Sequence, residues 1–216
     1  MQELTDLAVY AVDVGSVARK RLGWARAYAP DGKVDPRAQE TDIERLVDML
    51  AADLQASRPV ALGFECPLYI PVPARAQLLG KARVGEGNRS WSAGAGTGAL
   101  ATGLVEACWV LRALRKRVGE MPAHIDWLSF KRAGRGLFLW EAFVSAKAKA
   151  TDLTHHGDAA IAVERFFALL PDPTSADVLD APFPISLIGA AMIWSGWSDD
   201  VGLLQSKCLV VKALAA

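Results

Sequence analysis

An aspartate ends the first apolar run of this chain, and its position limits how the chain can fold. Residues 8–12 are apolar, Asp13 follows them, and a polar turn leads into a second apolar run that begins at Leu22. This pattern predicts two strands joined by a short turn. A carboxylate at the end of a buried strand needs a metal ion or hydrogen bonds to offset its lost hydration. Asp13 is therefore either a turn-capping residue or a ligand.

Length and composition favour one α/β domain over residues 1–216, with 52% hydrophobic residues to build its core. The 24 basic and 24 acidic residues give a formal net charge of zero, so any contact with nucleic acid has to come from a local patch. We expect no signal peptide and no membrane span, because no run of about 18 apolar residues occurs. The three scattered cysteines fit reduced thiols in a cytoplasmic protein; they are Cys66, Cys108 and Cys208.

Strand and helix patterns alternate along the rest of the chain. Strands are predicted at 7–14, 21–29, near Val34, 60–65, 136–143 and 208–214. Helices are predicted at 41–54, capped by Thr41 with Glu44 as its capping-box partner, at 100–117, at 158–170 and after Asp180 and Pro182. Residues 80–98 are predicted to form a long loop, which in a compact domain is usually functional or mobile. This order indicates an α/β fold with a mixed sheet.

Several acidic residues stand at or near the predicted element ends. Ligands of α/β sheets gather at the carboxyl ends of the strands, and hard cations such as Mg²⁺ or Mn²⁺ prefer oxygen ligands. Two such ions about 4 Å apart can support phosphodiester hydrolysis. Each acid also has an ordinary interpretation, as a solvated loop residue, an exposed strand residue or a helix cap. The candidates are Asp13, Glu65, Glu141, Asp177 and Asp180.

Three further features have both a functional and a structural interpretation. The glycine-rich stretch 85–98 could cradle a phosphate, with Arg89 contacting phosphate and Trp91 stacking on a base; alternatively, the glycines serve as turns and Trp91 packs on the core. His155 and His156 are interpreted as the solvated start of a helix rather than as metal ligands. The basic residues of 112–117 are interpreted as solvated cations that match a helix C-terminus rather than as a nucleic-acid site.

Two segments resemble ribonuclease H-like nucleases. AVDVGSVARKRLGWA is similar to the opening strand, turn and strand of the Holliday-junction resolvase branch, and SADVLDAPFPISLIGAA is similar to its closing motif, in which two aspartates three apart precede an alanine-rich helix. With GFECP, the glycine-rich loop and LFLWEAF between them, the order resembles the domain-of-unknown-function family numbered 429, a predicted ribonuclease H-like nuclease family. The resemblance implies a metal site of Asp13, Glu65 and Asp180, with Asp177 or Glu141 as a fourth member.

The chain departs from that family at two places. The middle motif usually reads Asp-x-Pro, whereas this chain has Glu65 followed by Cys66 and Pro67, and Pro182 and Pro184 interrupt the last helix. The leading expectation is a single ribonuclease H-like domain that hydrolyses phosphodiesters in nucleic acid with Mg²⁺ or Mn²⁺. The alternatives are an actin-like ATP-dependent phosphotransferase and a non-catalytic binding or scaffold module with the same fold.

Overall fold

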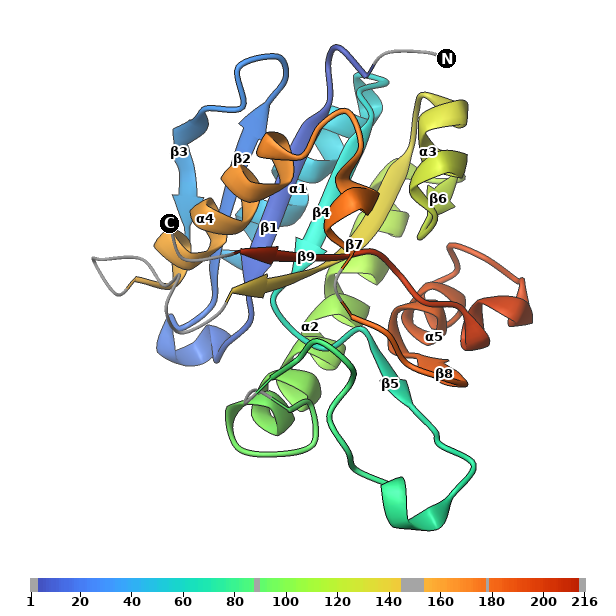
Figure 1. Cartoon of the computed structure of the whole chain (residues 1–216). Coiled ribbons are helices and arrows are strands. Elements are labelled where there is room, and N and C mark those ends of the chain that lie inside the picture. The colour runs from blue at the N-terminus through green and yellow to red at the C-terminus, as the bar shows by residue number, and fades with distance from the viewer. Residues whose placement is uncertain (1–3, 88–89, 145–153, 178, 214–216) are drawn as a thin grey trace.

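The chain forms a mixed α/β structure, which confirms the fold class predicted from the sequence. A computed structural model describes residues 4–87, 90–144, 154–177 and 179–213 (Figure 1). A seven-stranded sheet has the order β3-β2-β1-β4-β7-β6, and β9 also pairs with β7. A two-stranded sheet of β5 and β8 lies beside it.

The main sheet combines an antiparallel half with a parallel half. The first three strands are antiparallel neighbours, whereas β4 runs parallel to β1, and β7 runs parallel to β4, β6 and β9. The carboxyl ends of β1 and β4 therefore lie at the same edge of the sheet. The strands are β1 (Ala8–Asp13), β2 (Gly23–Tyr28), β3 (Val34–Glu40), β4 (Val60–Phe64), β6 (Ala123–His124), β7 (Leu137–Val144) and β9 (Val210–Ala213).

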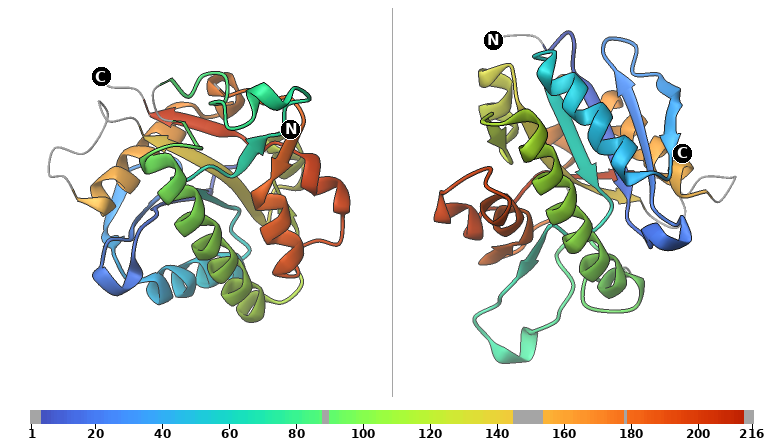
Figure 2. Two further views of the ribbon diagram at one scale, coloured as in Figure 1. Left: turned by 90° about the horizontal axis from the view of Figure 1, so that it is seen from below. Right: turned by 180° about the vertical axis from the view of Figure 1, so that it is seen from behind.

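Helices cover both faces of the sheet (Figure 2). The side chains of β1 alternate between the faces: Tyr10 and Val12 join the core beneath α1, α2 and α5, and Val9 and Ala11 join the core beneath α3 and α4. Because both faces are covered, the central strands are mostly apolar, with Asp13 on β1 and Glu141 on β7 as exceptions. The helices are α1 (Ile43–Gln55), α2 (Ala95–Val118), α3 (Trp127–Ala133), α4 (His155–Ala168) and α5 (Leu187–Trp194).

Local predictions fail where a nearby group offers a better partner. Asp42 rather than Thr41 caps α1, because its carboxylate accepts the N–H groups of Glu44 and Arg45. The helix predicted after Asp180 begins only at Leu187. The residues before it, Pro184–Ser186, form β8 and pair with β5 (Tyr69–Pro71). The sequence analysis did not predict β6 or α3.

The helix α2 combines a buried face with an exposed apolar face. Among the described residues it is the helix long and apolar enough to cross a membrane by length and composition, and 33% of its most apolar window is buried. A core helix passes the same test, and α2 packs against α1 and α5. Its apolar composition is therefore partly explained by core packing.

Candidate metal centre

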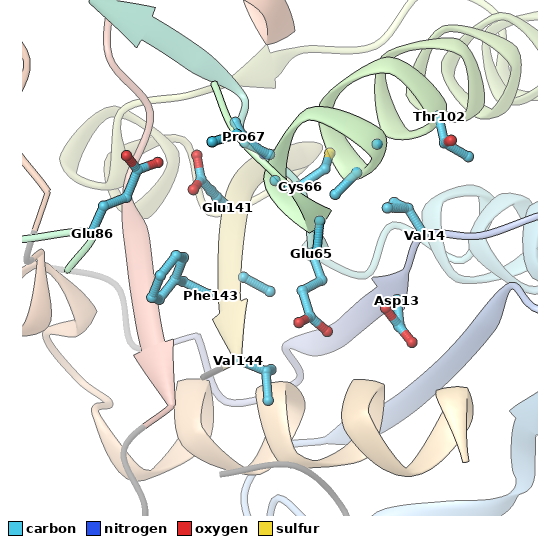
Figure 3. Close-up of a pocket in the computed structure, with 17 residues that line it drawn as sticks. Asp13, Val14, Glu65, Cys66, Pro67, Glu86, Thr102, Glu141, Phe143 and Val144 are labelled. Atoms are coloured by element: carbon cyan, nitrogen blue, oxygen red, sulfur yellow. The ribbon is translucent and has the colours of Figure 1, made fainter. Parts of the chain in front are cut away.

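Asp13 and Glu65 meet because their strands are parallel neighbours. Asp13 is the last residue of β1, and Glu65 directly follows β4. Val12 is paired with Phe64 in the register, and the N–H of Glu65 donates to the carbonyl of Val12 at 2.7 Å. The two carboxylates therefore lie next to each other at the carboxyl ends of the two strands, as Figure 3 shows.

A third carboxylate comes from α4. Asp158 lies in the first turn of this helix, whose N-cap Thr154 accepts the N–H of Gly157. One ligand atom from each of Asp13, Glu65 and Asp158 lies within 4.8 Å of the others. Asp13 and Asp158 are buried and Glu65 is half-buried. We call these three residues the acidic triad.

Gly23 allows the first turn of α4 to pack closely against the sheet, which brings Asp158 to Asp13 and Glu65. It is paired with Asp13 in the sheet register, and a Cβ atom at this position would lie 2.2 Å from the carbonyl carbon of His155 and 2.3 Å from the nitrogen of His156. Any larger residue would push the first turn of α4 away from the sheet. That turn also brings Nδ1 of His155 to 2.5 Å from Oδ2 of Asp13. The sequence predicted that His155 is the solvated start of a helix. His155 does begin α4, but its ring also contacts Asp13.

The triad could hold a metal ion. Three carboxylates at this separation repel one another, and all-oxygen donor sets are those that hard divalent cations prefer. Asp13 and Glu65 open into a cavity of about 530 Å³ (Figure 3). Residues of the first two turns of α2, including Gly98 and Thr102, line another side of this cavity. The amino end of a helix favours anions there.

Glu141 also lines this cavity, but it belongs to a different cluster. Its carboxylate accepts Nη1 and Nη2 of Arg83 at 2.8 and 2.7 Å and the N–H of Leu68 at 2.9 Å. The Nε of Arg83 donates to Glu86 at 2.9 Å. Burial raises the pKa of Glu141, and the charge of Arg83 opposes this rise. We call Arg83, Glu86 and Glu141 the arginine cluster; the structure thus places Glu141 in a buried ion pair, outside the acidic triad.

Asp180 and Asp177 do not join the triad either. Asp180 is exposed and accepts Nζ of Lys207 at 2.6 Å, which lowers the pKa of its carboxyl group. Asp177 accepts a hydrogen bond from the N–H of Val210 at 3.3 Å, and partial desolvation raises the pKa of its carboxyl group. Both residues precede β8, where pairing with β5 holds the chain extended instead of helical. The triad takes its third carboxylate from Asp158 instead.

Of the two residues predicted to contact a nucleic acid, Arg89 and Trp91, the structure describes Trp91. Arg89 lies outside the described residues. The indole N–H of Trp91 donates to the carbonyl of Lys81 at 2.9 Å, and its backbone N–H donates to Glu86 at 3.1 Å. Trp91 therefore ties its loop to the arginine cluster. The last four residues of the predicted loop, 95–98, belong to α2, which begins at Ala95.

Sequence reasoning missed three groups at or beside this centre: Asp158, the contact of His155 with Asp13, and Glu106. An acid in a first helical turn has an ordinary role there, so Asp158 carried no separate signal. Glu106 interrupts the apolar stripe of α2, which was a usable signal. It is buried, it accepts the N–H of Gly15 at 3.4 Å, and burial raises its pKa to about 7.

No family model, curated protein or solved structure gives a significant match to this chain. The class supported by the geometry is an α/β protein with a candidate carboxylate metal centre at the carboxyl edge of its sheet.

Proposed function

We propose that this protein is a metal-dependent nuclease that hydrolyses phosphodiester bonds. The observation that carries the proposal is the convergence of Asp13, Glu65 and Asp158 from three separate elements within 4.8 Å. We propose Mg²⁺ or Mn²⁺ as the ion, since both prefer oxygen ligands. The strand order, with an acid at the end of β1, is compatible with the ribonuclease H-like fold that the sequence resemblance implies.

Each residue of the centre has a defined part in the proposed reaction. When bound, a divalent ion supplies stabilisation of the charge that develops on the phosphate. Asp13 and Asp158 are buried, and the low dielectric constant of their surroundings strengthens their interaction with a cation. His155 orients the Asp13 carboxylate through Nδ1, and its side chain is 41% exposed, so it can accept a proton from an attacking water.

The first turn of α2 also lines the cavity. Its backbone N–H groups and helix dipole suit a phosphate group of the substrate. A phosphodiester in the cavity would thus meet both carboxylate ligands and amide donors.

Calorimetric titration with Mn²⁺ tests the metal centre. We expect the wild type to bind Mn²⁺ and the Asp13→Asn and Asp158→Asn variants to lose binding. Asp180→Asn is the matched control, because that carboxylate is exposed and paired with Lys207; it should bind like the wild type. Absence of binding in the wild type, or loss only in Asp180→Asn, would contradict the assigned ligands.

Cleavage assays then test the activity. Single-stranded, duplex and branched DNA and RNA are incubated with Mn²⁺ and each variant. Cleavage that disappears in Asp13→Asn and persists in Asp180→Asn is the expected result. Mn²⁺ binding without cleavage of any of these substrates would instead support a non-catalytic role.

We also propose a cytoplasmic location. All three cysteines are free, and Cys66 and Cys208 are buried. Thiols kept in this form are typical of reducing compartments.

A further inference from the structure

A second hollow lies on the exposed side of α2, toward its carboxyl end. It has a volume of about 800 Å³ and is lined by α2 residues together with Trp194 at the end of α5. Three of its apolar side chains are exposed to an unusual degree for their size: Val105 by 69%, Trp109 by 41% and Trp194 by 58%. We call this hollow the α2 groove.

The groove combines these aromatic side chains with cations. The guanidinium of Arg112 lies 4.9 Å from the centre of the Trp194 ring, and Lys116 lines the same groove. Arg117 also lines it, although its Nη2 is 3.1 Å from Asp48. Positive charge and exposed indole rings thus occur side by side on a chain whose formal net charge is zero.

The α2 groove and the metal-centre cavity share one stripe of α2. Thr102 lines the cavity, and Val105, Trp109, Arg112 and Lys116 line the groove at alternating spacings of three and four residues. Residues at these spacings lie on one side of a helix. At a rise of about 1.5 Å per residue, the stripe extends roughly 21 Å from Thr102 to Lys116.

We propose that the α2 groove binds single-stranded nucleic acid and that the strand runs along α2 toward the acidic triad. Unpaired bases stack on Trp109 and Trp194, and Arg112 and Lys116 contact the phosphates. Aromatic rings interleaved with cations suit this ligand, because every base has a face to stack and every nucleotide carries a negative charge. Only the direction of the strand toward the triad rests on the proposed nuclease function.

Charge complementarity favours a polyanion over an apolar protein partner. A purely apolar helix seated in the groove would remove Arg112 and Lys116 from water without a counter-charge, which is costly. A duplex offers phosphates but keeps its base faces stacked, so it uses only part of the groove.

Fluorescence anisotropy with a labelled oligothymidylate of about 15 nucleotides, in EDTA, tests the groove apart from the metal. We expect Trp194→Ala and Arg112→Ser each to weaken binding about fivefold or more. Trp194→Phe keeps a ring and should retain binding within about twofold of the wild type. Arg132→Ser is the matched control, since Arg132 is an exposed cation on α3, across the sheet.

Three results would overturn the proposal: no binding by the wild type, unchanged binding by both groove variants, or equal loss in Arg132→Ser. A concentration-dependent dimer that Trp194→Ala abolishes, without oligonucleotide binding, would assign the groove to a second copy of the chain. Near-ultraviolet circular dichroism of each variant shows that it is folded. The anisotropy assay contains EDTA and the Mn²⁺ titration contains no oligonucleotide, so failure of the metal centre and failure of the groove give different results.

Discussion

Two groups of carboxylates contribute to one cavity, and their surroundings differ. In the arginine cluster, the side chains of Glu86 and Glu141 contact a guanidinium, and all three side chains are at most 1% exposed. In the acidic triad, Asp13 contacts an imidazole, whose charge depends on its protonation. Carboxylates of both groups line this cavity: Asp13 and Glu65 from the triad, and Glu86 and Glu141 from the arginine cluster.

The difference shows that neighbouring side chains decide what an acid at a strand end does. Glu141 is occupied by Arg83 and by a backbone N–H, so its charge is offset within the protein. The triad brings three carboxylate oxygens together beside a histidine, and divalent cations such as Mg²⁺ and Mn²⁺ prefer oxygen ligands. The arginine cluster is therefore a buried ion-pair network, whereas the triad is the candidate metal centre.

Removal of Arg83 should have the largest effect on stability. Arg83→Met leaves Glu86 and Glu141 buried without their cation, and we expect it to lower the free energy of unfolding by about 3–5 kcal/mol. Urea unfolding monitored by circular dichroism measures this. Adding Glu141→Gln should restore part of the loss, because one buried charge is then removed. A loss below about 1 kcal/mol would contradict the structural role of the cluster.

Glu106 should make stability depend on pH, because it is a buried carboxylate held by a backbone N–H. The folded chain keeps its proton up to about pH 7, whereas the unfolded chain releases it near pH 4.5. Stability from this group is full below pH 4.5 and is lost as the pH rises through 7, by about 3 kcal/mol in total.

Glu106→Gln should flatten this dependence. Urea unfolding at pH 5 and pH 8 in EDTA compares the variant with the wild type. An equal slope in both proteins would show that Glu106 is not the responsible group.

Mn²⁺ should stabilise the wild type but not a variant of the triad. At a concentration 100-fold above its dissociation constant, a ligand specific for the folded state adds about 2.7 kcal/mol. We expect this gain in the wild type and in Arg83→Met, and no gain in Asp158→Asn. Thermal unfolding with and without Mn²⁺ measures it. Equal stabilisation of Asp158→Asn would place the ion elsewhere.

Asp180→Asn should have the smallest effect. The Asp180 carboxylate is exposed and its partner is a surface lysine, and such pairs contribute little to stability. We expect an unfolding midpoint and an Mn²⁺ affinity that match the wild type. A clear loss of Mn²⁺ affinity would restore the ligand set that the family resemblance implies.

The sequence predicted those parts of the fold that local pattern determines. The runs around Asp13 and Glu65 are strands because short apolar segments bounded by turn residues favour buried strands, and the parallel pairing of β1 and β4 brings the two acids together. The terminal strand near Val210 is confirmed for the same reason. Two of the three triad residues were therefore within reach of sequence reasoning.

The third triad residue was not, because its position depends on tertiary packing. Asp158 reaches the edge of the sheet because the first turn of α4 packs against Gly23 of β2. The sequence around Asp158 contains no pattern that predicts this packing. Asp180 was favoured because its local motif is more distinctive, but strand pairing of Pro184–Ser186 with β5 keeps the helix from starting there.

The docking of α4 also determines when the centre can exist during synthesis. Asp13 and Glu65 leave the ribosome early, whereas Asp158 emerges more than ninety residues after Glu65. A chain released by a stalled ribosome between these points carries two of the three carboxylates and cannot assemble the triad. Truncated translation products that end before Asp158 therefore lack the complete candidate centre.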